Sequence, residues 1–153
     1  MAAGDVTVYE EALAYMLDGG WAPADSIAID LILATSTPTA ADAAPDPSDY
    51  NLATSTEGEQ VLDTWANCVT EAGGTMTFDD TGASVTWAQG GGNSTTCRWA
   101  IIFNTTQAGN NGICFVDLGS NRDLSAGSIT LTWNASGKQI PKVSRCWIRG
   151  RTA

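Results

Sequence analysis

The sequence predicts a mainly β single domain, covering residues 1–153, with one short helix near the N-terminus. Aromatic and β-branched residues, which favour strands, are concentrated between residues 97 and 133. Turn-forming residues interrupt them about every ten residues. A single run of strands cannot bury both of its faces, so we expect the remaining chain to supply a second layer.

The helix is predicted over residues 7–18. Thr7 and Glu10 have the spacing of an N-terminal capping box, and the pair Gly19 and Gly20 provides a stop signal. Two interpretations remain open for its apolar stripe: it packs on its own domain, or it contacts a neighbouring subunit. The residues of this stripe follow one another at helical spacing and are Tyr9, Ala12, Leu13 and Met16.

Residues 26–34 are apolar almost throughout, which predicts a central strand. Residues 35–58 follow as a long loop rich in Thr, Ala, Ser, Pro and Asp, and a loop of this length is usually functional, mobile or at a subunit contact. Its aspartates Asp42, Asp46 and Asp49 lack the glycine and the closing glutamate of a calcium-binding loop. No metal site is therefore predicted there.

The later elements are predicted from short apolar runs separated by turn residues. Residues 60–70 fit either a short helix or an irregular strand, and we favour the strand. A flexible loop is expected at 89–93, and the last strand, interrupted at Pro141, is expected at a sheet edge. The other predicted strands cover residues 75–78, 84–87, 97–103, 113–118, 128–133 and 138–148, with 97–133 forming a three-stranded meander and turns at 72–74 and 79–82.

The charges are segregated along the chain. Residues 1–97 contain fifteen acidic side chains and no Lys or Arg, whereas residues 98–153 contain all seven basic side chains and two aspartates. An acidic body repels nucleic acid, and no run of about twenty apolar residues exists, so neither nucleic acid nor a membrane is an expected partner. The basic residues of segment 138–153 have two interpretations: they dock on an acidic protein surface, or they form a solvated sheet edge.

The residue types needed for familiar catalytic sites are missing or badly spaced. The chain contains no His, which removes a Ser-His-Asp relay and the commonest metal ligand. The Gly-rich stretch 89–93 lacks the Lys-Ser/Thr ending of a phosphate-binding loop. The sequence therefore predicts no enzymatic activity, no catalytic residues and no cofactor.

Four cysteines, none in a CxxC pair, argue against a zinc ribbon or a thioredoxin-type site. We favour buried apolar thiols over disulfides, although Cys97 and Cys114 are expected on neighbouring strands and are candidates for a pair. The other two are Cys68 and Cys146.

Six tryptophans allow a stacking surface for sugars. Trp87, Trp99 and Trp133 fall inside predicted strands, which favours core or intersubunit packing. Trp21, Trp65 and Trp147 are less constrained, and an exposed one would indicate a glycan or protein contact.

The order of motifs resembles that of small virion proteins of tailed bacteriophages. A short helix ending in Gly-Gly (9–20) is followed by the strand 26–36 and by a Thr/Pro/Asp loop that ends near Asp49 and Asn51. This chain departs from the group in its basic extension beyond Gly137 and in its four cysteines. The later matching motifs are residues 85–88, 98–105, 113–119 and 126–137.

This resemblance implies a capsid cement or decoration protein on the capsid exterior of a virion assembled in the bacterial cytoplasm. Its expected partners are the major capsid protein and further copies of itself, as a homotrimer. Our prediction for the fold of the single domain is a β-sandwich of the jelly-roll type. The alternative is a tail, collar or fibre component that contacts host glycan. The candidate contact residues are Tyr9, Leu13, Met16, Tyr50, Lys138, Lys142, Arg145, Trp147, Arg149 and Arg151.

Overall fold

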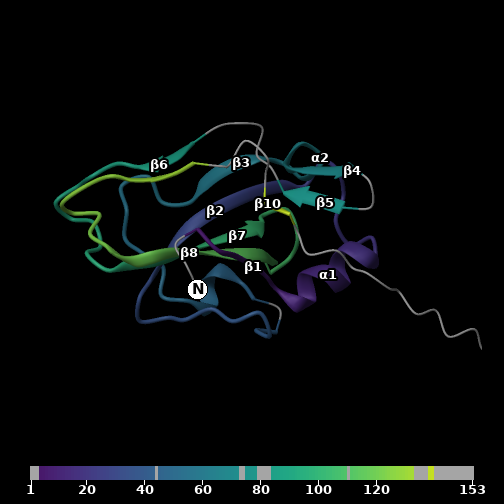
Figure 1. Ribbon diagram of the computed structural model, residues 1–153, viewed down its shortest axis with the longest axis horizontal. Helices are drawn as coiled ribbons and strands as arrows, with labels where there is room; N and C mark the ends of the chain where they lie inside the picture. Colours follow the sequence, from purple (N-terminus) through teal and green to yellow (C-terminus); the bar gives the residue numbers. More distant parts are fainter. Residues whose placement is uncertain are drawn as a thin grey trace, which may run out of the picture.

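The computed structural model describes residues 4–43, 45–72, 75–78, 84–109, 111–132 and 138–139 (Figure 1). Within these ranges the protein is mainly β, as predicted, with antiparallel strand pairs and little helix. The buried apolar side chains of these residues form a cluster around the largest sheet.

The largest sheet has five antiparallel strands in the order β1-β8-β7-β2-β3. Its strands are β1 (Val6–Val8), β2 (Ser26–Leu33), β3 (Gln60–Thr64), β7 (Cys97–Asn104) and β8 (Gly112–Arg122).

Strand β2 is central, as predicted, and is hydrogen-bonded along both edges. One edge pairs with β7 from Ile27 to Leu33. The other edge pairs with β3 only as far as Ile29. Beyond Ile29, residues 51–53 form the hydrogen bonds to this edge. Ala53 N–H donates to the Leu31 carbonyl at 2.8 Å, and Leu33 N–H donates to the Asn51 carbonyl at 2.9 Å.

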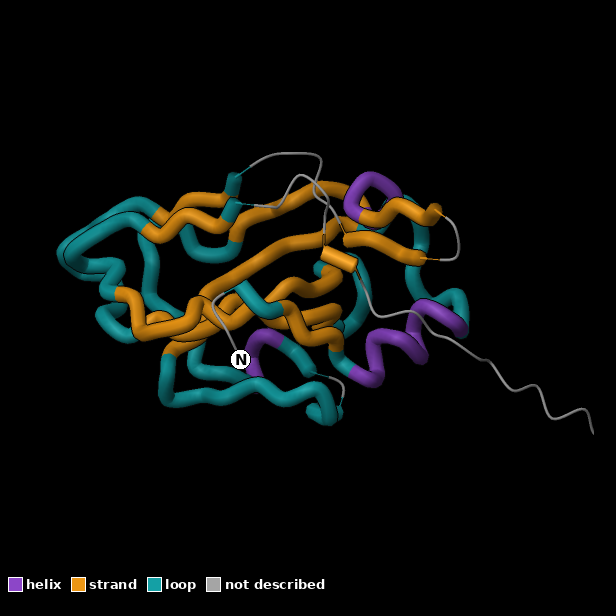
Figure 2. Tube along the Cα trace, in the orientation of Figure 1, coloured by secondary structure: helices purple, strands orange, loops and turns teal. Residues whose placement is uncertain are grey.

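Two smaller sheets complete the described β structure (Figure 2). Strand β6 (Val85–Trp87) pairs with β9 (Ile129–Leu131), and β5 (Thr75–Phe78) lies between β4 (Val69–Ala72) and β10 (Lys138–Gln139). In Figure 1, β6, α2, β4 and β5 lie toward the β3 side of the molecule, and α1 lies toward the side of β1 and β8.

The predicted three-stranded meander is wrong at its third strand. Strand β9 pairs with β6 instead of β8, because the outer edge of β8 is already occupied by β1 through pairs such as Val6 with Val116. The strand predicted over residues 113–118 is longer than predicted, since β8 continues to Arg122, which pairs with Cys97.

The helix α1 (Glu10–Leu17) is shorter than predicted. Thr7 cannot cap it, because Thr7 pairs with Phe115 inside strand β1, and the N-cap position is held by Tyr9 without a side-chain hydrogen bond. The predicted stop is confirmed, since Gly19 has a φ of +68°, which favours glycine. Tyr9 and Ala12 are fully buried, so the apolar stripe packs on its own domain.

Residues 60–70 combine both alternatives, because a single helical turn, α2 (Trp65–Cys68), separates β3 from β4. This turn is anchored by Trp65 N–H, which donates to the Asp25 carbonyl at 2.7 Å. The stretch 89–93 is a loop, as predicted. Within it Asn93 is buried, and its side-chain amide donates to the Ala88 carbonyl at 3.0 Å. The predicted turn at 79–82, residues 73–74 and residues 140–148 of the last strand lie outside the described residues.

Between β2 and β3 the chain forms no strand and a single 3-10 helix, η1 (Pro47–Asp49), among the residues described there. This connection packs against β8, since Gly112 N–H donates to the Pro45 carbonyl at 2.7 Å. It also meets the start of α1, where Glu10 N–H donates to the Ala40 carbonyl at 2.8 Å.

A buried ion pair links β7 to β8. The Arg98 guanidinium lies 2.5 Å from one Asp117 carboxylate oxygen, and Gly119 N–H donates to the same oxygen at 2.6 Å. Asp117 is completely buried, and the Arg98 guanidinium stacks 4.7 Å from the centre of the Trp99 ring. A buried carboxylate that is paired and hydrogen-bonded in this way is compatible with a folded core.

Gly112 is expected to be sensitive to substitution. A Cβ at this position would lie 2.9 Å from the Pro45 carbonyl oxygen and 3.0 Å from the Tyr9 ring, so Gly112→Ala must push the η1 connection away from β8. We expect a loss of about 1–3 kcal/mol in the free energy of unfolding, measured by urea denaturation. The control Gly91→Ala has no atom within 4 Å of the new Cβ, and equal stability of both variants would contradict this packing.

Candidate interaction surface

The three aspartates of the η1 connection are engaged in local hydrogen bonds. Asp42 accepts from Thr39 N–H at 3.0 Å. Asp46 and Asp49 form a capping box at the N-terminus of η1, in which Asp46 accepts from Ser48 N–H at 2.7 Å and Asp49 accepts from Asp46 N–H at 3.0 Å. Burial alone would raise the pKa of Asp42, but the hydrogen bonds from Thr39 and Tyr50 outweigh it and lower the pKa below the ordinary value. Among the described residues there is no group of three or more potential metal ligands.

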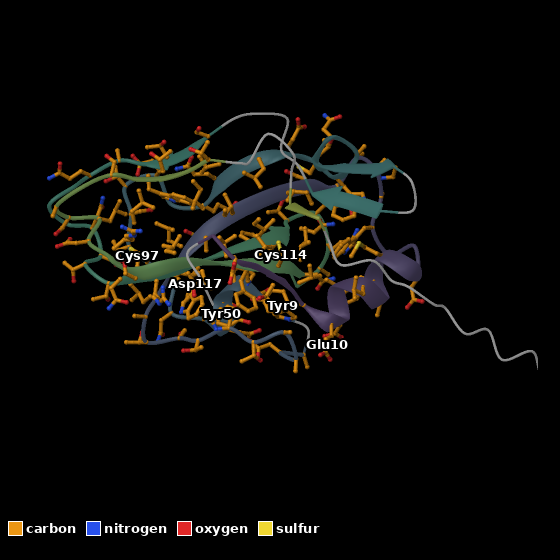
Figure 3. The ribbon with its side chains drawn as sticks, viewed as in Figure 1. Tyr9, Glu10, Tyr50, Cys97, Cys114 and Asp117 are labelled. Atoms are coloured by element: carbon orange, nitrogen blue, oxygen red, sulfur yellow. The ribbon has the colours of Figure 1, made fainter. Side chains whose placement is uncertain are left out.

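Tyr9 and Tyr50, both predicted contact residues, lie next to one another beneath the sheet (Figure 3). Tyr9 is fully buried and has no surface to offer another protein, so its prediction as a contact residue is wrong. The reason is that Tyr9 packs on Phe115, with the ring centres 5.3 Å apart. Tyr50 is half-buried, and its hydroxyl donates to Asp42 at 2.6 Å.

The remaining predicted contact residues divide into two groups. Leu13 and Met16 are half-buried and pack against the core, so each keeps some accessible surface. Lys138 contributes its backbone to β10 through pairing with Phe78. The others lie outside the described residues: Lys142, Arg145, Trp147, Arg149 and Arg151.

Three of the four cysteines are buried, and Cys146 lies outside the described residues. Cys97 and Cys114 do not face each other, because Cys97 pairs with Arg122 and Cys114 pairs with Ile102. Figure 3 shows them well separated along the sheet. Burial raises the pKa of the Cys114 thiol to about 12 and also raises the pKa of Cys97, so neither thiol is a reactive nucleophile near neutral pH.

The tryptophans that the structure describes are mostly core residues. Trp87 and Trp99 are buried, and the Trp87 indole N–H donates to the Gly58 carbonyl at 2.9 Å. Trp21 is also buried and lies between two half-buried rings, 4.9 Å from Trp65 and 6.2 Å from Tyr15, centre to centre. Trp133 and Trp147 lie outside the described residues.

A surface that the sequence did not predict lies along the β3-side edge of β2, and we call it the β2–β3 strip: Asp30, Leu52, Glu59 and Val61. Val61 pairs with Ala28, and Leu52 pairs with Ile32. Opposed residues share a face of a sheet, and so do alternate residues of one strand. Asp30 therefore faces the same way as Leu52 and Val61, about 7 Å along the strand from each pair.

The two apolar members of the strip are unusually exposed. Val61 is 67% exposed and Leu52 is 36% exposed, and they are the exposed large hydrophobic side chains of the described chain. Two such residues flanking one site on a sheet edge form a surface that another protein would cover favourably.

Asp30, between them, is 7% exposed, and among the described residues its carboxylate accepts one hydrogen bond, from Leu31 N–H at 2.7 Å. Burial raises its pKa to about 6, and the charge of Glu59 adds to this rise, although the Leu31 hydrogen bond opposes it. The strip thus combines exposed apolar groups with two carboxylates that repel each other.

Sequence reasoning missed these four residues. One signal was present, since Asp30 is the sole charged residue in the apolar run 26–34, and a charge in a central strand needs an explanation. No sequence pattern distinguishes Leu52 or Val61 from other apolar residues, because their exposure depends on which strands pair.

Comparison with known protein families, curated proteins and solved structures finds no match. No helix in the described part of the chain is long and apolar enough to cross a membrane.

Asp30→Asn is expected to stabilise the fold at pH 8 by about 1–2 kcal/mol. The pKa of Asp30 is about 6 in the fold and 3.8 ordinarily, so the protonated carboxyl favours folding at low pH, and this contribution is lost as the pH rises through 6. The variant should therefore differ from the parent at pH 8 and resemble it near pH 4. Urea denaturation at the two pH values measures this, and a variant less stable than the parent at pH 8 would refute the assignment.

Proposed function

We propose that the protein is a non-enzymatic virion structural protein, a capsid cement or decoration protein that binds and stabilises the shell of a tailed bacteriophage. The observation that carries the proposal is the order of motifs from the Gly-Gly-terminated helix to residues 126–137, which resembles that of small phage virion proteins. A β-sandwich of the jelly-roll type is the finer fold that belongs with this proposal.

The β2–β3 strip supports a role in protein contacts. Exposed Leu52 and Val61 supply apolar area, and Asp30 and Glu59 supply charge for recognition. Many modest contacts of this kind add up on a repeating shell, because each bound copy holds its neighbours at high effective concentration. The proposed partners are the major capsid protein and further copies of this chain, as a homotrimer on the capsid exterior.

A tail, collar or fibre component that contacts host glycan is the second candidate. The aromatic group formed by Tyr15, Trp21 and Trp65 favours it, since the two outer rings are half-buried and keep some surface for stacking on a sugar.

The copy number in purified particles separates the two candidates. For a cement protein we expect one copy per major shell subunit, or a simple fraction of it, because the contact sites repeat with the shell. Quantitative mass spectrometry against the major shell protein gives this ratio. A few to a few dozen copies per particle would move the protein to the tail or fibres, and absence from particles would reject both virion roles.

A further inference from the structure

We propose that the β2–β3 strip binds a cationic segment of a second copy of this chain, supplied by the basic residues between 142 and 151. The inference rests on the self-association that forms part of the proposed function, and it names the surface and the chemistry through which the copies meet.

The carboxylates of the strip lack a cation from the described part of their own chain. The two arginines whose side chains are described are engaged elsewhere: Arg98 pairs with Asp117, and Arg122 donates to the Leu118 carbonyl at 3.2 Å. Asp30 is more than nine-tenths buried, lies close enough to Glu59 for that charge to raise the Asp30 pKa, and accepts a single described hydrogen bond. A cation placed between the two carboxylates would relieve their repulsion and provide the missing partner.

The apolar flanks of the strip fit a Lys- or Arg-rich segment. Lysine and arginine carry aliphatic stems that pack on apolar surface while the charged end reaches a carboxylate. Leu52 and Val61 lie on either side of Asp30 and are placed to receive such stems. The strip therefore matches a segment with both cations and apolar residues.

The C-terminal part of the sequence has this composition. Of the seven basic residues of the chain, five occur from Lys138 onward, and the run 145–149 places Trp147 and Ile148 between two arginines. The first ninety-seven residues contain no basic residue at all, so a second copy approaching the strip has this segment as its concentrated source of positive charge.

We infer that the segment bound to the strip comes from a second copy of the chain. In such an assembly each copy contributes one strip and one basic segment. Two or three copies make the contact repeatedly, which strengthens a closed assembly without any new type of contact. Docking of the basic segment on its own chain is the competing arrangement, and it would leave the protein monomeric.

The strip also predicts the pH dependence of this association. Among the described residues, the titratable group whose charge acts on Asp30 is Glu59, which precedes β3. Asp30 in turn contributes to the raised pKa of Cys97 in β7, although burial is the main cause of that rise. With a pKa of about 6, Asp30 is ionised at pH 8 and largely protonated at pH 5. Self-association is therefore expected to weaken as the pH falls below 6.

The test is sedimentation equilibrium of the full-length protein at pH 8 and pH 5. The parent is expected to self-associate at pH 8, and the double variant Asp30→Asn with Glu59→Gln is expected to associate about tenfold more weakly. Replacing Lys142, Arg145, Arg149 and Arg151 by Gln should weaken association similarly, and high salt should do the same. The matched control Glu57→Gln removes an exposed carboxylate of the same connection and should leave association unchanged.

Urea denaturation of the Asp30→Asn variant shows whether weaker association is due to misfolding. The variant is expected to be a more stable monomer that associates more weakly. A monomeric parent, or variants that associate as the parent does, would overturn the inference. Its failure is distinguishable from failure of the virion role: the association is measured on pure protein, whereas the virion role depends on copy number in particles.

Discussion

The constraint on which the rest of the structure depends is the pairing of strand β2 along both edges. An apolar strand buried on both faces must satisfy every backbone N–H and C=O group within the protein. Strand β7 does this on one side from Ile27 to Leu33, but β3 does it on the other side only as far as Ile29. The chain therefore has to return through residues 51–53 to complete the second edge.

This return organises the long connection between β2 and β3. Hydrogen bonds fix the connection at several places, among them β2 through residues 51–53, β8 through Pro45, and α1 through Ala40. Gly112 permits the second of these contacts, because any Cβ there would collide with Pro45. A loop that looks irregular in sequence is thus held by backbone hydrogen bonds to regular elements.

The sequence predicted the parts of the fold whose signal is local. The continuous apolar runs at β2, β7 and β8 identified the centre of the sheet, and Gly19 identified the end of α1. The pairing of the successive strands β7 and β8 was predicted and is confirmed. Pairing between strands distant in sequence was not predictable, and β9 pairs with β6 across more than forty residues. Strand β1 was missed because three residues are too few to show the alternation of apolar and polar side chains that marks a strand. The spacing of Thr7 and Glu10 also matched a helix capping box, which favoured a helix at this position.

The candidate site was harder to predict for the same physical reason. Asp30 stood out as a charge within an apolar strand, but its meaning depends on Glu59, Leu52 and Val61, which join it only through the two-part pairing of one strand edge. Full pairing of β2 fixes this carboxylate in a place where its ionised form costs the isolated chain stability. A cationic partner would lower that cost, so part of the binding free energy would come from relief of an unfavourable interaction already present in the monomer. A surface of this kind would couple the stability of the fold to the binding of such a partner.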